Sequence, residues 1–355
     1  MPVLEAVFRS TWPMSFRRPG VFEAHVHGPG AASETLVYPM PSTIAGALAS
    51  LAYEAGLCSS SELAERAEKE PYGDTSLCLE RLLGENYRIY TGLARHRGEL
   101  YAYTGQSLVK LDQLKQALAE AAKEGPSRLA STLTHMLQQL QSIKPGRLRR
   151  TGVALNRVAK TAAPGLLYSI EMLDPITQDV TPLEILALIQ ADRSLRGSYL
   201  VALGGEQRPA KLTLTTRGTD PQQLLTEHRG SERALLMLVS PALLRESPWT
   251  KGVVDLTLTA AKHLAEKLLE EAGLGDTLEP VEPYIVQLTR EPVEALMPGW
   301  SRIAERPRKP MIVVPAGTIM VAKIVRTGMD STEYTVSYGL GCCTKLGWGS
   351  AIAVL

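Results

Sequence analysis

The sequence predicts an α+β fold made of two sheets, each covered on one face by helices. A chain of 355 residues is long enough for about two domains of ~150 residues each. Each half shows the same order of patterns, a strand followed by a helix and then by further strands. The composition, 45% hydrophobic and 21% charged, is typical of a globular protein. We therefore expect one domain over residues 1–220 and a second over residues 230–355.

The first domain begins with an apolar strand over residues 3–8. Apolar and polar residues alternate over 22–26, which predicts a half-exposed strand. The stretch PMPSTIAGALAS then predicts a helix over residues 42–55, because its apolar residues recur at helical spacing. Ser42 or Thr43 is the expected N-terminal cap, and Gly56 suits the C-terminal cap.

Two strands and a helical pair are expected next. Residues 87–92 and 99–104 predict strands joined by the basic turn Arg95-His96-Arg97-Gly98. Leucines at helical spacing predict two helices between residues 111 and 140, and Gly125-Pro126 separates them. The helical pair is predicted to be an insertion over about residues 108–143.

A basic segment over about residues 144–172 predicts a projecting loop or hairpin, because glycine and proline frame it. Residues 144–160 contain no acid and six cations, namely Lys144, Arg147, Arg149, Arg150, Arg157 and Lys160. Such a run favours a polyanion as partner, and a solvated surface loop stays open as the alternative. Thr181-Pro182-Leu183-Glu184 has the pattern of a capping box and predicts the start of a helix.

Residues 199–203 predict a short buried strand that belongs to the first half. The second half repeats the plan, and residues 234–239 predict a central strand. A helix is expected over 261–272, ending at Gly273, and a strand around Ile285 and Gln287. Residues 311–314, 319–325 and 350–355 predict three further strands, the last of them after a glycine-rich segment.

Charge and cysteine content exclude several classes of protein. The net charge of +1 gives the molecule no overall positive electrostatic potential that would attract nucleic acid. A local basic patch is compatible with this net charge. None of the four cysteines has the Cys-x-x-Cys spacing of a zinc site, so we expect reduced thiols in a cytoplasmic protein. We expect no signal peptide, no membrane span, no metal and no cofactor, because no segment has the required pattern.

Two turns are candidate phosphate sites. The helix entry offers the hydroxyls of Ser42 and Thr43 beside backbone N–H groups, although an ordinary capped helix explains the same residues. Gly204 and Gly205 follow a strand and permit close backbone approach, with Arg208 beyond them. A plain hairpin is the structural alternative for this turn.

The closing glycine-rich segment is a third candidate. Gly339, Gly341 and Gly347 leave backbone N–H groups available, with Lys345 as a cation and Trp348 as a stacking face. The segment has neither the spacing of a Walker loop nor that of a Rossmann fingerprint.

The histidines do not form a catalytic pattern. His25 and His27 face the same side of a predicted strand, but no third ligand lies at metal spacing. No Ser-His-Asp or His-Glu-x-x-His arrangement is found, so the residues alone give no sign of catalysis.

Several segments in a fixed order resemble a known family. They are PMPSTIAGAL, TGVALNRVAKTAAPGLLYSIEML, LGGEQRPAKL, VVPAGTIM and GLGCCTKLGWGSAI. Together they resemble the third subunit of the Cmr complex, a Cas5-like group of the RAMP superfamily in type III-B CRISPR effectors. The resemblance covers nearly the whole chain, apart from the helical pair.

The resemblance implies two ferredoxin-like (RRM-like) domains and an RNA-binding subunit without nuclease chemistry. It implies binding of the 5′ tag of the crRNA, with the segment 144–172 acting as a thumb-like hairpin beside the guide–target duplex. The implied partners are the large polymerase/cyclase-like subunit and a neighbouring RAMP backbone subunit. The candidate RNA-binding residues are Arg17, Arg18, Ser42, Thr43, Arg147, Arg149, Arg150, Asn156, Arg157, Lys160, Gly204, Gly205, Arg208, Gly339, Gly341, Lys345, Gly347 and Trp348.

Two alternatives stay open. The first is a related RAMP endoribonuclease that processes precursor crRNA, with His25 or His27 as general acid or base. The second is a scaffold that makes no RNA contact.

Overall fold

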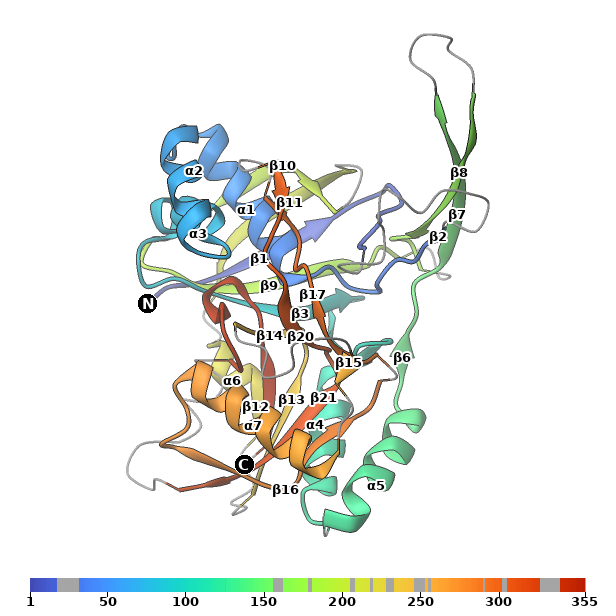
Figure 1. Cartoon of the computed structure of the whole chain (residues 1–355), viewed down its shortest axis with the longest axis vertical. Helices are drawn as coiled ribbons and strands as arrows, with labels where there is room; N and C mark the ends of the chain where they lie inside the picture. The colour runs from blue at the N-terminus through green and yellow to red at the C-terminus, as the bar shows by residue number, and fades with distance from the viewer. Residues whose placement is uncertain are drawn as a thin grey trace.

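The structure of the chain is a computed structural model with a mixed α+β architecture, as the sequence predicts (Figure 1). It describes residues 1–17, 32–124, 126–155, 162–177, 181–204, 208–217, 220–227, 233–245, 253–254, 257–289, 291–301, 305–325 and 339–354. Within the described residues no helix is long and apolar enough to span a membrane.

The first half of the chain forms an eight-stranded antiparallel sheet in the order β10-β11-β1-β9-β3-β4-β5-β6. Its strands are β1 (Val3–Arg9), β3 (Arg88–His96), β4 (Glu99–Tyr103), β5 (Leu108–Lys110), β6 (Ser142–Ile143), β9 (Glu184–Gln190), β10 (Gly197–Leu203) and β11 (Arg208–Arg217). In chain order β1, β3, β9 and β11 are the first, second, third and fourth of these four strands. Across the sheet they lie in the order β11-β1-β9-β3, that is fourth, first, third and second.

The second half repeats that order in a five-stranded sheet, β12-β22-β13-β21-β16. The strands are β12 (Thr226–Glu227), β13 (Arg233–Leu238), β16 (Leu278–Gln287), β21 (Thr318–Ile324) and β22 (Ala351–Val354). Four of these strands, β13, β16, β21 and β22, pair in an antiparallel way in the order β22-β13-β21-β16. Helix α7 (Leu258–Ala272) lies between β13 and β16 in the chain and ends at Gly273, as predicted. Short elements complete this half: α6 (Pro221–Leu225), β14 (Ala242–Leu244), β15 (Val253–Val254), β17 (Val293–Leu296), β18 (Trp300–Ser301), β19 (Arg306–Pro307) and β20 (Met311–Val314).

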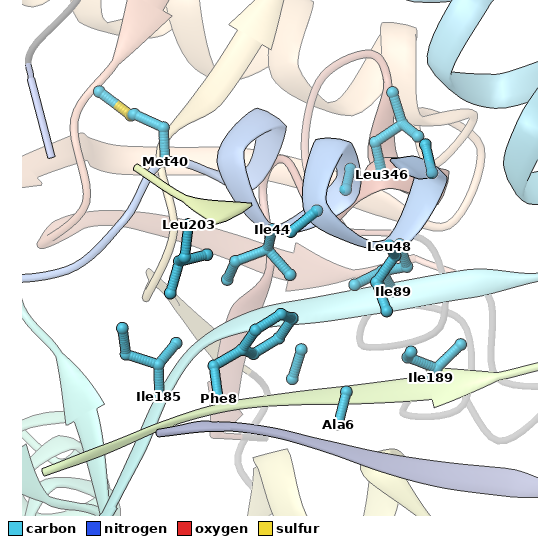
Figure 2. Close-up of a cluster of buried hydrophobic side chains, with 14 of the residues drawn as sticks. Ala6, Phe8, Met40, Ile44, Leu48, Ile89, Ile185, Ile189, Leu203 and Leu346 are labelled. Carbon is cyan, nitrogen blue, oxygen red and sulfur yellow. The ribbon is translucent and has the colours of Figure 1, made fainter. Parts of the chain in front are cut away.

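Helix α1 (Pro41–Glu54) lies on one face of the eight-stranded sheet, with α2 (Ser60–Lys69) and α3 (Gly73–Leu83) beside it (Figure 1). Figure 2 shows Phe8 of β1 and Ile185 of β9 below Ile44 of α1. A fully buried side chain of this size stabilises the fold by about 1.5–3 kcal/mol. α1 also contacts α3, β10 and the short turn η1 (Thr344–Leu346), so a helix rich in alanine is enclosed on several sides.

The opposite face of the same sheet packs against the second half of the chain. Val7 and Leu186 alternate with residues of the α1 face and join Leu236 and Ile312 in one hydrophobic cluster. β1 is therefore buried on both faces, which explains why its sequence is a continuous apolar run rather than an alternating one. The expected division near residues 220–230 stays a prediction, and this cluster crosses it.

The predicted helical pair is confirmed as α4 (Leu111–Ala121) and α5 (Pro126–Gln139). Leu118 and Leu133 are fully buried in the cluster shared with the second half, and α5 contacts β16. The helical insertion of the first half thus packs on the sheet of the second half (Figure 1).

Several local predictions were wrong. Met40 is the N-cap residue of α1 and no side chain caps the helix, so neither Ser42 nor Thr43 has that role. The capping-box pattern at 181–184 leads into strand β9 instead of a helix. β10 is a largely exposed edge strand rather than a buried one.

The cysteine prediction was wrong in part, because Cys58 and Cys78 form a disulfide. Cys342 and Cys343 are free thiols, as expected. Helices α2 and α3, which the disulfide and the Ser59 capping box stabilise, were not predicted.

Candidate nucleic-acid interface

The basic segment forms a hairpin of β7 (Arg147–Leu155) and β8 (Ala162–Leu173), with β2 (Ala32–Ser33) paired to β8. The hairpin projects far from the body of the molecule, which confirms the predicted shape (Figure 1). Arg147, Arg149 and Arg150 lie on exposed positions of β7. A two-stranded ribbon that carries exposed arginines can follow a nucleic-acid backbone with little steric hindrance.

The three arginines differ in their surroundings. Arg147 donates a hydrogen bond of 2.7 Å to the Glu171 carboxylate, which ties it to β8. The side chains of Arg149 and Arg150 have no ion pair or hydrogen bond within the described residues. Because successive strand residues point to opposite faces, these two cations lie on opposite sides of the ribbon. They are the arginines of β7 most available to a ligand.

The base of the hairpin is fixed to the end of the first sheet where β1 and β3 end and β9 and β11 begin. Met14, just after β1, forms two backbone hydrogen bonds with Leu173 at the end of β8. We call this end of the sheet, together with β7, the arginine edge. Its arginines are Arg9, Arg95, Arg147, Arg149, Arg150 and Arg208.

A network of ion pairs orders the arginine edge. Arg95 donates to Glu5 at 2.6 Å and to Glu184 at 2.7 Å, and Arg9 also donates to Glu184. Burial alone would raise the pKa of Glu184, but the hydrogen bonds from Arg9 and Arg95 outweigh burial and hold that pKa below its usual value. The side chain of Arg9 stays 54% exposed, so it is a positioned cation at the surface.

The β10–β11 turn lies at the same edge. Gly204 has φ +78°, and a Cβ there would come within 2.7 Å of the Ser15 carbonyl oxygen, so a glycine is required. The Nε of Arg208 is buried and has no hydrogen-bond partner within the described residues. Close by, the Trp12 N–H donates to Ser10, whose hydroxyl donates to the Pro209 carbonyl, and the Trp12 side chain is 54% exposed.

The start of α1 also faces this edge, since Met40 lies above Leu203 of β10 and Ile185 of β9 (Figure 2). Ser42 and Thr43 are half-buried, and the Met40 carbonyl accepts the N–H of Thr43 at 2.9 Å. Ser42 is close to Gly299 and to the buried Tyr72 phenol. The two hydroxyls are therefore partly covered by protein.

Of the remaining candidate residues of the first half, the structure describes Arg17. Arg17 pairs with Thr35 in an isolated bridge beside the base of the hairpin. Five candidate residues lie outside the described residues, namely Arg18, Asn156, Arg157, Lys160 and Gly205. His25 and His27 do so as well.

The glycine-rich segment lies at the opposite end of β3. Arg88, the first residue of β3, donates to the Thr344 hydroxyl at 2.6 Å, and Lys345 donates to the Glu85 carbonyl at 3.2 Å. Gly347 meets Thr91 of β3 and accepts its hydroxyl at 2.9 Å. This segment therefore does not join the arginine edge.

The role expected for Trp348 was wrong, because its side chain is fully buried and its ring packs at a tilt against Tyr72, with ring centroids 6.1 Å apart. Gly339 and Gly341 have positive φ, and a Cβ on either would press against backbone atoms. The glycines serve close packing, because the backbone N–H of Gly341 donates to the Leu268 carbonyl inside the protein. Lys345 is the member of this group with an exposed cation.

Sequence reasoning missed Arg9 and Trp12. Both follow the first apolar strand directly, and a basic residue and an aromatic residue after a strand end were a usable signal. Within the described residues no cluster of three His, Cys, Asp or Glu side chains could hold a metal ion.

These features define an α+β protein with a repeated strand order and a basic, hairpin-bearing edge suited to a polyanion. The sequence model of one family, described as "CRISPR-associated protein (Cas_Cmr3)", matches residues 106–355. The chain belongs to this family, and its resemblance to the third Cmr subunit is confirmed. The matched segment includes the hairpin and the glycine-rich segment but not α1.

Two solved structures contain a chain of similar fold. One is the "Cryo-EM structure of the Type III-B Cmr-beta bound to cognate target RNA and AMPPnP, state 1", at 17% identity and a TM-score of 0.53, covering 90% of this chain and 86% of that chain. The other, with cognate target RNA, is 18% identical with a TM-score of 0.53, covering 89% and 86%. This likeness supports the fold alone. A comparison with curated proteins gave no match.

Proposed function

We propose that the chain is a non-catalytic RNA-binding subunit of a type III-B CRISPR effector complex and that it binds the 5′ tag of the crRNA. The observation that carries the proposal is the arginine edge. There a projecting hairpin bears Arg149 and Arg150, whose side chains have no partner within the described residues, near the ordered cation Arg9. Membership of the Cas_Cmr3 family supports the same assignment.

The arginine edge is better suited to a single-stranded tag than to a double-stranded nucleic acid. Arginines on both faces of a narrow ribbon can contact phosphates of a strand that passes around it. The exposed Trp12 beside the β10–β11 turn offers a face on which an unstacked base can rest. The half-buried Ser42 and Thr43 lie at the same edge, and we propose them as secondary contacts to the strand.

We also propose that each half is a ferredoxin-like domain. The support is the strand order, since the fourth, first, third and second strands lie side by side in both sheets, with a helix between the first and second. The proposed protein partners are the large polymerase/cyclase-like subunit and a neighbouring RAMP backbone subunit.

The test compares two double variants that remove the same charge. R149A/R150A changes the unpaired arginines of the hairpin, and R66A/K69A changes two exposed cations of α2 that already pair with glutamates. We expect the hairpin variant to weaken binding of a labelled tag RNA and to reduce the salt slope by ~0.7 log unit per lost phosphate contact. The α2 variant should leave both unchanged.

Equal slopes for the hairpin variant and the wild type would refute the arginine edge as the RNA site. Gel analysis of labelled precursor RNA after incubation with the wild type tests the remaining part of the proposal. Intact RNA is the expected result, and discrete cleavage would contradict a non-catalytic role.

A further inference from the structure

Cys342 and Cys343 are neighbours in the chain whose sulfur atoms lie 3.3 Å apart. Cys343 has a left-handed backbone, with φ +58°, which is uncommon for a residue with a side chain. The Cys342 N–H donates to the Leu243 carbonyl at 2.8 Å, and the Cys343 carbonyl accepts from the Leu346 N–H at 3.0 Å. The backbone on both sides is therefore fixed, and it holds the two thiols together.

The two thiols have different surroundings. Cys342 is buried, whereas Cys343 is partly exposed. The two sulfur atoms share a hydrogen bond. This contact, together with the nearby Arg245 and Arg308, holds the pKa of Cys343 below its usual value. The same hydrogen bond and burial raise the pKa of Cys342. A partly exposed thiol whose pKa is lowered, beside a second thiol, is the arrangement found in redox-sensitive cysteine pairs.

We infer that Cys342 and Cys343 form a reversible dithiol that peroxide converts to a disulfide between adjacent residues, with Cys343 as the attacking thiolate and Cys342 as the resolving thiol. In the first step the Cys343 sulfur forms a bond to one peroxide oxygen, the O–O bond breaks, and hydroxide leaves. Sulfur is oxidised to a sulfenic acid and the peroxide is reduced.

In the second step the Cys342 sulfur attacks the Cys343 sulfur and the S–O bond breaks. The departing hydroxide takes the Cys342 proton and leaves as water. The hydroxide of the first step takes up the proton that Cys343 lost in forming its thiolate. The whole reaction therefore consumes one hydrogen peroxide and both thiol hydrogens and releases two water molecules. A dithiol reductant reverses it by thiol–disulfide exchange through a mixed disulfide.

The geometry makes this disulfide labile. Adjacent Cα atoms are about 3.8 Å apart, below the usual range of about 4.4–6.8 Å for disulfides. The bonded state is strained, and strained disulfides are readily reduced. The Cys58–Cys78 disulfide is buried on both sides, at 5% and 2% exposure, and should not exchange under the same conditions.

Neither the arginine edge nor RNA binding is needed for this chemistry, so it is tested on the purified full chain. The reduced protein is treated with equimolar hydrogen peroxide, alkylated, and digested without reductant. We expect the peptide with residues 342 and 343 to escape alkylation and to lack the mass of two hydrogen atoms. Mild dithiol treatment should restore both alkylation sites.

Two single variants separate the roles. In C342S we expect a sulfenic acid at Cys343 that dimedone traps, because no resolving thiol is present. In C343S we expect Cys342 to react at least about tenfold more slowly than Cys343 does in C342S, because the thiolate is the reactive form. Alkylation of both cysteines after peroxide treatment of the wild type would overturn the inference. So would equal reactivity of the two single variants.

Discussion

At the scale of single residues, Gly204 lies where a side chain would be unfavourable for two reasons, the backbone conformation and a steric clash. It has φ +78°, and an added Cβ would lie 2.7 Å from the Ser15 carbonyl oxygen. We predict that G204V lowers the free energy of unfolding by about 1–3 kcal/mol, measured by urea denaturation.

A second glycine provides the control. Gly46 lies inside α1, and nothing lies within 4 Å of an added Cβ. G46A should therefore raise the free energy of unfolding by about 0.5–1 kcal/mol, because alanine favours a helix interior. Wild-type stability of G204V would contradict the described turn.

Glu184 gives a prediction on pH. Its pKa is held below the ordinary value of 4.5, mainly by hydrogen bonds from Arg9 and Arg95 that outweigh burial. A lowered folded-state pKa contributes stability above pH 4.5, and that contribution is lost as the pH falls through the folded pKa. We predict that E184Q costs about 1.5–3 kcal/mol at pH 7 and that the difference from wild type narrows below pH 4.5. A difference that is constant with pH would show that the carboxylate charge is not involved.

Two of the four tryptophans, Trp12 and Trp348, show the limit of residue-level prediction. Trp348 stands among glycines and was expected to be exposed, yet it is fully buried, while Trp12 is 54% exposed. Glycines are compatible both with an open loop and with tight packing, and the partners that decide between them, such as Thr91, lie more than 200 positions away in the chain. Local sequence does not contain that information.

At the scale of elements, strands with a clear apolar run were predictable, and caps were less so. β1, β13, β20 and β21 lie where the sequence indicates. β9 was missed because the TPLE pattern is local, whereas pairing with β1 and β3 is made by residues far away in the chain. The ribbon β7–β8 was predictable as a projecting hairpin, because its glycine, proline and arginine content is unlike that of a core element.

The helical pair gives a prediction at the element scale. Leu133 of α5 is fully buried in the cluster shared with the second half. L133A should lower the free energy of unfolding of the whole chain by about 2–5 kcal/mol, because it opens a cavity in that cluster. T134A, on the exposed side of α5, should change it by less than about 0.5 kcal/mol. If L133A unfolded only the helical pair and left the remaining transition unchanged, the insertion would not belong to the shared core.

At the scale of the whole molecule, the sequence indicates a similar succession of elements in both halves, but local patterns do not give the order in which the strands lie across each sheet. The two halves reach the same strand order with different residues, because strand order depends on which strands pair and not on local propensity. The net charge of +1 likewise gave no indication of where on the molecule a basic edge lies. The arginines of that edge come from segments as distant as Arg9 and Arg208, and only the fold brings them together.

The candidate site was therefore predicted in part. The hairpin arginines and the Gly204 turn lie at one edge of the sheet, as an RNA path requires, while the glycine-rich segment lies at the other. The most direct test is photo-crosslinking in the complex assembled with its guide RNA. A photoreactive residue would replace exposed Leu148 on the hairpin or, in a second variant, Lys345 at the far edge. Adducts between position 148 and nucleotides of the 5′ tag, with none from position 345, are the predicted result. RNA adducts from position 345 alone would contradict the account.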